Sequence, residues 1–194
     1  NTKWAKFPEW NIDRTQPAGP VEVFGKTIPF TGILGRMETY GRKGFNGDSL
    51  GKKDGEEVMC DFFSLRDIWT NPSAKHYNEL VDEFVRIYAF YIEEIGVDGL
   101  RIDTIKHVHH QFWADFTSRL RKKIGNRAKD VILFGEAYDG APEVLGKYTY
   151  GTDDNDVSIG GMLNFQMCWA MRNYLRHGAE KYGHASGIES AMSD

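Results

Sequence analysis

Apolar positions follow two different patterns along the chain, and the change between them falls near residue 70. Before that point prolines interrupt the sequence, and glycines recur between residues 41 and 55. Short alternating pieces, such as residues 21–24, predict brief strands between long loops. We therefore expect residues 1–70 to form a loop-rich subdomain with little helix.

From residue 71 the apolar pattern becomes regular. Asn71 followed by Pro72 is typical of a helix start, with Asn at the cap and Pro at the first helical position. The apolar residues after them recur at spacings of three and four, which predicts an amphipathic helix that ends at Gly96. These apolar residues are Leu80, Phe84, Ile87, Tyr88, Tyr91 and Ile95.

Strands and helices alternate through the rest of the chain. Residues 97–102 and the apolar run at 131–134 predict two strands, and the apolar residues between 112 and 120 predict a helix that separates them. Residues 162–165 predict a third strand that leads into a helix reaching about Arg176. This alternation predicts an α/β fold with a parallel sheet, whose chemistry lies at the carboxyl ends of the strands.

Composition and charge then remove several classes of protein. The 194 residues are 41% hydrophobic and 27% charged, a balance that excludes a disordered chain. No apolar run reaches the roughly 18 residues of a transmembrane helix, so we expect no membrane partner. A net charge of −4 provides no excess positive charge for nucleic acid. The sequence leaves the compartment open, with a soluble secreted or periplasmic location favoured.

Two carboxylates stand at the ends of the first two predicted strands. Arg101 and Asp103 share one face of the first strand, so the arginine favours the ionised form of the aspartate. Glu136 ends the second strand. Neighbouring strands lie about 4.8 Å apart, close to the roughly 5–5.5 Å between the carboxyl groups of a retaining glycosidase. This spacing predicts Asp103 as nucleophile and Glu136, with a raised pKa, as acid/base. On spacing alone, a local ion pair is the alternative.

The residues around both carboxylates resemble signatures of a known family. Residues 96–103 read Gly-Val-Asp-Gly-Leu-Arg-Ile-Asp, and with Lys106 and His107 they closely resemble the fourth-strand signature of the α-amylase family of glycoside hydrolases, family 13. Residues 132–137 read Ile-Leu-Phe-Gly-Glu-Ala and resemble the fifth-strand signature. The resemblance implies that residues 71–194 form part of a (β/α)8 TIM barrel, about strands 4 to 6, and that residues 1–70 are the subdomain inserted before it.

The resemblance also implies a role for each residue of the two signatures. Asp103 would form a covalent glycosyl-enzyme, Glu136 would act as general acid and then as base, and Arg101 would hold the charge of Asp103. Lys106 and His107 would contact sugar on the leaving-group side. The chemistry would need no cofactor, although some members bind a structural calcium through the backbone carbonyl that matches His107.

Aromatic side chains offer surfaces on which sugar rings can stack. Tyr138 is the strongest candidate, because it lies two residues after Glu136 and on the same side of the strand. Trp10, Tyr40 and Trp69 are further candidates.

Metal binding is the competing interpretation of the polar clusters. His107, His109 and His110 match no zinc spacing, because two of them are adjacent. Residues 153–156 lack the glycine and the terminal glutamate of an EF-hand loop. We therefore expect no catalytic metal.

Two signatures of the family are missing from these residues. The third-strand motif ends in Asn-His and the seventh-strand motif in Asn-His-Asp, and neither occurs in the sequence. The seventh-strand motif would supply the third catalytic carboxylate, and an eight-stranded barrel needs at least about 200 residues. We therefore expect an internal fragment of a retaining hydrolase that acts on an α-glucan such as starch. The fragment would be inactive without the rest of the barrel.

Two alternatives to hydrolysis remain open. A transglycosylase of the same family would use the same covalent intermediate and deliver it to a sugar hydroxyl instead of water. A non-catalytic carbohydrate-binding or interaction protein on a degenerate barrel would need neither carboxylate.

Overall fold

The computed structural model describes residues 21–23, 26–28, 32–40, 67–150 and 158–182. Near the start, the antiparallel strands β1 (Val21–Val23) and β2 (Lys26–Ile28) confirm a brief strand at the predicted place. Two short 3-10 helices follow, η1 (Gly32–Gly35) and η2 (Met37–Thr39). Most of the predicted subdomain 1–70 lies outside the described residues, so its boundaries stay a prediction.

The first long helix is shorter than the sequence predicts. Helix α1 (Tyr77–Phe90) continues into a π-turn, η5 (Tyr91–Ile95), and ends at Gly96 with φ 82°, as the glycine predicts. The predicted start at Asn71 is wrong. The Asn71 Oδ1 atom accepts hydrogen bonds from the backbone N–H and the hydroxyl of Ser73, so it closes a local turn instead of capping a helix.

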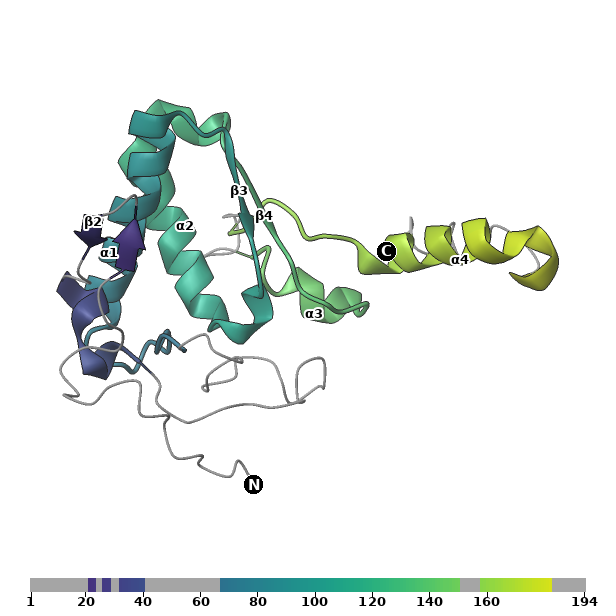
Figure 1. Ribbon diagram of the computed structural model, residues 1–194, viewed down its shortest axis with the longest axis horizontal. Helices are drawn as coiled ribbons and strands as arrows, with labels where there is room; N and C mark the ends of the chain where they lie inside the picture. Colours follow the sequence, from purple (N-terminus) through teal and green to yellow (C-terminus); the bar gives the residue numbers. More distant parts are fainter. Residues whose placement is uncertain (1–20, 24–25, 29–31, 41–66, 151–157, 183–194) are drawn as a thin grey trace, which may run out of the picture.

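Two parallel strands form the centre of the described structure. Strand β3 (Gly99–Ile102) pairs with β4 (Ile132–Gly135), and helix α2 (His110–Ile124) connects them through the 3-10 helix η7 (Gly125–Lys129). In Figure 1, α1 and α2 lie side by side on one side of the strands. The unit is the strand–helix–strand crossover of an α/β fold, as the alternation predicts.

Apolar side chains from both helices and from one face of the sheet form the core. The Phe112 ring makes edge contacts with Tyr77, Phe84 and Trp113, with ring centres 5.4–6.5 Å apart. Leu100 packs against this core from β3. On β4, Leu133 is 5% exposed whereas its neighbour Ile132 is 67% exposed. In the part of the chain that the structure describes, helices therefore cover only one face of the sheet.

The third predicted strand is reduced to a single parallel bridge between Gly135 and Met162. The reason is that a helix begins early. Asn164 accepts a hydrogen bond at Oδ1 from the Met167 N–H at 2.8 Å, and this contact is typical of an N-cap. Helix α4 (Phe165–Tyr182) therefore includes Phe165, which the sequence assigned to the strand, and extends past the predicted end at Arg176.

Among the described residues after β4, the structure contains two helices, α3 (Pro142–Gly146) and α4. The short helix α3 lies near the carboxyl ends of the strands, and α4 runs away from the α1–α2 layer (Figure 1). None of the described helices is long and apolar enough to cross a bilayer.

Candidate active site

The register of the two strands brings both predicted carboxylates to one edge of the sheet. Ile102 pairs with Gly135, so Asp103 and Glu136 are the next residues of their strands. The pairing continues past the strands, because the Glu136 N–H donates to the Ile102 carbonyl at 2.7 Å. Paired residues of parallel strands point to the same face, which here is the open one. The strands are neighbours, as the prediction of a carboxylate pair requires.

The carboxyl end of β3 is marked by an unusual backbone conformation. Thr104 has φ 50° and ψ 36°, a left-handed conformation that β-branched residues rarely adopt. The chain then turns into the 3-10 helix η6 (Ile105–His107), and the Ile105 N–H donates to the Glu136 carbonyl at 3.0 Å. Strained backbone of this kind persists where the surrounding structure fixes it, and it is common at active sites.

The structure explains why a glycine precedes Glu136, which the sequence alone did not reveal. A Cβ atom on Gly135 would lie 2.6 Å from Cδ1 of Ile105 and 2.7 Å from Sδ of Met162. Ile105 is fully buried, and the Trp113 indole N–H donates to its carbonyl at 2.9 Å. A side chain before Glu136 would therefore press on the side chains of Met162 and of Ile105, which belongs to the turn that follows Asp103.

The electrostatic surroundings of the two carboxylates differ. Two effects raise the pKa of Glu136: the larger is a hydrogen bond to the Asp103 carboxyl group, and the second is burial. The Arg101 guanidinium opposes this shift. Arg101 forms its ion pair with Glu136, whereas the sequence places the arginine against Asp103. Glu136 is the diagonal cross-strand neighbour of Arg101, within reach of a long side chain. Whether Arg101 also stabilises the charge of Asp103 stays a prediction.

This arrangement would allow the two carboxyl groups to take different chemical roles. A carboxyl group with a raised pKa can hold a proton near neutral pH and donate it, while an ionised partner beside it acts as a nucleophile. Asp103 is exposed, so a ligand can reach it, and the Glu136 side chain is 23% exposed. The structure therefore supplies the proximity that this chemistry needs.

Lys106 and His107 both lie in η6, directly after Asp103 and Thr104. Lys106 is only 3% exposed, and its ammonium group donates to the Tyr138 carbonyl at 3.4 Å and to Asp139 Oδ2 at 3.3 Å. His107 is half-buried. Their predicted contacts with sugar stay predictions. Asp139 was missed by the sequence analysis, because no motif distinguishes it from an ordinary loop aspartate.

Tyr138 stands in the loop after β4 with its ring largely open to solvent. The side chain is 63% exposed, and it makes edge contacts with Phe165 at 5.1 Å and Trp169 at 5.4 Å from the start of α4. This geometry leaves aromatic surface free next to Glu136. Among the other aromatic candidates, the Tyr40 hydroxyl donates to the Leu34 carbonyl, and Trp10 lies outside the described residues.

A pocket of about 220 Å³ opens beside the Tyr138 loop, between α3 and the start of α4. Leu145 and Met162 give it an apolar wall, and Asn164 and Gln166 add amide groups. The Gln166 amide also donates to the Gly140 carbonyl, which fixes one side of the pocket.

The three histidines do not form a metal centre in the described structure. His109 caps α2, because its Nδ1 accepts a hydrogen bond from the Gln111 N–H at 3.2 Å, and its ring stacks on His110 at 4.8 Å. Across the described ranges, no group of three or more His, Cys, Asp or Glu side chains is placed to hold a metal ion. The structural calcium that the resemblance allows, through the backbone carbonyl of His107, stays a prediction, and the acidic run 153–156 lies outside the described residues.

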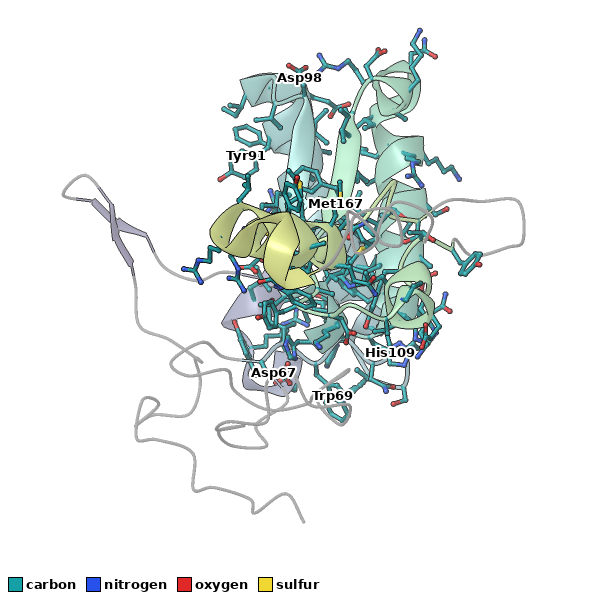
Figure 2. The ribbon with its side chains drawn as sticks, turned by 90° about the vertical axis from the view of Figure 1, so that its right-hand side faces the viewer. Asp67, Trp69, Tyr91, Asp98, His109 and Met167 are labelled. Carbon is teal, nitrogen blue, oxygen red and sulfur yellow. The ribbon has the colours of Figure 1, made fainter. Side chains whose placement is uncertain are left out.

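Figure 2 shows where the site lies along the strands. Asp98, just before β3, marks one end of the sheet, and His109, after the turn that follows Asp103, lies at the opposite end near Trp69. The candidate site is therefore at the carboxyl edge, where enzymes built on parallel strands place their chemistry.

Comparison with known proteins points in the same direction. The family described as "Alpha amylase, catalytic domain" matches residues 56–188. The chain is 32% identical over 136 residues to an α-amylase of Streptomyces lividans, a match that covers 69% of this chain and 13% of that protein. It is 24% identical over 130 residues to a cyclomaltodextrin glucanotransferase of Bacillus sp. (strain 1011), covering 66% of this chain and 17% of that protein.

The described fold is also similar to that of solved amylases. An α-amylase from Geobacillus thermoleovorans, crystallised with acarbose, superposes with a TM-score of 0.54 at 20% identity, covering 70% of this chain and 26% of that one. Such amylases are TIM barrels, and the β3–α2–β4 unit is consistent with one part of such a barrel. The chain spans less than a fifth of the length of the two curated relatives above.

Proposed function

The chain belongs to the family of α-amylase catalytic domains, and on that premise we propose that it carries two catalytic carboxylates of a retaining enzyme acting on α-glucans. The observation that carries the proposal is the strand register, which pairs Asp103 with Glu136 at the carboxyl edge of the sheet. The raised pKa of Glu136 supports its assignment as the acid.

The first step forms a covalent intermediate. A carboxylate oxygen of Asp103 attacks the anomeric carbon while the bond from that carbon to the leaving oxygen breaks. Glu136 transfers its proton to the leaving oxygen, so the departing sugar leaves as a neutral alcohol. Arg101 then stabilises the carboxylate of Glu136, with which it already forms an ion pair.

The second step releases the sugar. Glu136, now ionised, takes a proton from water while the water oxygen attacks the anomeric carbon. The ester bond to Asp103 breaks, and both carboxyl groups return to their starting states. Two carboxylates and one water molecule account for every proton and bond, so the chemistry as proposed requires no cofactor.

We also propose that this chain supplies only part of the active site. The curated relatives are several times longer, and among the described strands only the parallel pair β3 and β4, with the Gly135–Met162 bridge, would belong to an eight-stranded barrel. The rest of the barrel would contribute the third carboxylate and would close the open face of the sheet. Alone, the 194 residues should therefore hydrolyse no glucan.

The nucleophile assignment is tested by Asp103→Asn in the protein expressed from its complete gene. Because the amide cannot form the glycosyl ester, we expect kcat/KM on maltooligosaccharides to fall by at least about a thousandfold. Asp98→Asn is the matched control, since Asp98 is 89% exposed at the far end of β3. Activity of the Asp103 variant within tenfold of the unsubstituted protein would contradict the role.

Transglycosylation is a second candidate function, and the similarity to a cyclomaltodextrin glucanotransferase is the observation that supports it. Both reactions use the same intermediate and differ only in the acceptor. Product analysis with a single maltooligosaccharide separates them, because hydrolysis gives only shorter products and transfer gives longer or cyclic ones. A non-catalytic protein would give neither set of products.

A further inference from the structure

Lys106 is the buried cation of the site, and its surroundings explain why it can be buried. Its side chain is 4% exposed, and burying an ammonium group is costly unless it is paired and hydrogen-bonded. Its partners are the Tyr138 carbonyl and the Asp139 carboxylate, both in the loop that follows Glu136. The ammonium group therefore points from the turn after β3 into the loop after β4.

Asp139 binds in two directions at once. Its Oδ2 accepts from Lys106, while its Oδ1 accepts from the backbone N–H groups of Gly140 at 2.8 Å and Ala141 at 3.0 Å. Burial alone would raise the pKa of Asp139, but the hydrogen bonds from Ala141, Lys106 and Gly140 together lower it below the ordinary value. One carboxylate thus orders the loop and anchors Lys106.

The two residues occupy equivalent places after the two catalytic candidates. Lys106 is the third residue after Asp103, and Asp139 is the third after Glu136. Resting on the function proposed above, we propose that the Lys106–Asp139 pair is a clamp that positions the acid/base Glu136 relative to the nucleophile. Lys106 then acts as a positioning residue through the loop, because its ammonium group makes two contacts within the protein.

A second contact shows what the clamp adds. The Ile105 N–H donates to the Glu136 carbonyl, which fixes the backbone where the loop begins. The Lys106 ammonium fixes the same loop two and three residues further on, at Tyr138 and Asp139. The turn after β3 therefore holds the backbone on the C-terminal side of Glu136 at two places, and loss of the clamp would leave Ile105 as the contact from that turn.

The test uses Lys106→Met, Asp139→Asn and the double variant, in the protein expressed from its complete gene. A misplacement of about 1 Å can cost a catalytic group a hundredfold in rate, so we expect each single variant to lose about 10- to 100-fold in kcat with little change in KM. Because both residues form one contact, the double variant should lose no more than the worse single variant.

Two substrates with different leaving groups distinguish a misplaced acid from a general loosening of the fold. Cleavage between two sugars requires a proton from the acid, whereas a maltosyl fluoride has a good leaving group and needs that proton far less. The clamp variants should therefore lose much more activity on maltooligosaccharides than on the fluoride. Equal losses on both substrates would overturn the positioning role.

Two control variants make the same changes of charge as the clamp variants, but at exposed positions outside the clamp. Lys122→Met removes an exposed cation from α2, and Glu143→Gln removes an exposed carboxylate from α3. Both should keep kcat and KM within about twofold, as surface substitutions usually do. Clamp variants that behave like these controls, or single-variant losses that multiply in the double variant, would overturn the proposal.

Hydrogen exchange gives a readout that does not depend on activity. In both clamp variants the amides of Gly140 and Ala141, which bind Asp139, should exchange faster, while those of β3 should not. Unchanged exchange in Lys106→Met would overturn the clamp. If the unsubstituted complete protein does not cleave or transfer glucans, the proposed function fails, and this exchange experiment still decides whether the clamp exists.

Discussion

The two faces of the β3–β4 sheet are built from alternating residues of the same strands, yet different forces hold them. On the covered face, Leu100 packs against the core and its register partner Leu133 is buried, so burial of apolar surface stabilises this face. On the open face, Arg101 and Glu136 form an ion pair beside Asp103, and Ile132 is exposed. The covered face supports the fold, whereas the open face gathers charge at one edge.

The proposed chemistry depends on only a small part of the sheet. The covered face fixes the register of the strands, and the register alone brings Asp103 next to Glu136. The open face then requires only short loops that hold each carboxylate, through Ile105 and through the Lys106–Asp139 clamp. Substitutions that act on one face and not on the other therefore test whether this separation holds.

The largest expected effect is on the free energy of unfolding, when adjacent residues on opposite faces of β4 are each replaced by alanine. Leu133→Ala should lower the free energy of unfolding by about 2–5 kcal/mol, the usual cost of a cavity in a core. Ile132→Ala should cost less than about 1 kcal/mol if its 67% exposure persists, but as much as Leu133→Ala if the open face becomes the interior of a barrel.

We expect the larger cost for Ile132→Ala in the protein expressed from its complete gene, measured by denaturant unfolding. A cost below about 1 kcal/mol there would mean that the open face is solvent-exposed in the complete protein. That result would contradict the assignment of this face to a barrel interior.

Much of the covered face was predictable from sequence, because local periodicity determines it. The end of the α1–η5 helical stretch at Gly96 and both parallel strands follow from apolar spacing and from a glycine. The errors fall where a polar side chain satisfies the backbone locally. Asn71 closes a turn where a helix start is predicted, and Asn164 caps a helix where a strand is predicted.

The open face was predictable only in part. The two carboxylates follow from their places at strand ends, and the resemblance to a family strengthens the assignment. The pairing of Arg101 with Glu136 and of Lys106 with Asp139 was not predictable, because each joins residues 33 or more apart in sequence. Such pairs depend on strand register and loop conformation, neither of which a single sequence shows.

A smaller effect is expected in how stability depends on pH. The contributions of Glu136 and Asp139 should change with pH in opposite directions. The pKa of Glu136 is raised above its ordinary 4.5, so its contribution to stability is present at low pH and is lost as the pH rises through the raised value. The pKa of Asp139 is lowered below its ordinary 3.8, so its contribution is present at higher pH and is lost as the pH falls.

Denaturant unfolding between about pH 3 and pH 7 measures both contributions. Relative to the unsubstituted protein, Glu136→Gln should become more stable as the pH rises, and Asp139→Asn should become less stable. The same sign for both variants would contradict the environments described for the two acids.

The smallest effect is expected at Tyr138, where the open edge offers an aromatic surface. Tyr138→Ala should raise KM for maltooligosaccharides by about 2- to 10-fold and leave kcat nearly unchanged, because an aromatic contact is worth about 0.5–1.5 kcal/mol. Tyr150→Ala is the matched control, since Tyr150 is also exposed, at 72%. An equal change in both variants would remove Tyr138 from the binding surface.

The central claim is that Asp103 forms a covalent bond to the substrate while Glu136 supplies and removes a proton. A fluorinated glycosyl donor that forms the intermediate quickly and releases it slowly tests this claim directly, by mass spectrometry of peptides from the complete, active protein. The account predicts one added glycosyl group, attached to Asp103. Attachment to Glu136 or to any other residue, or inactivation without a covalent adduct, would contradict it.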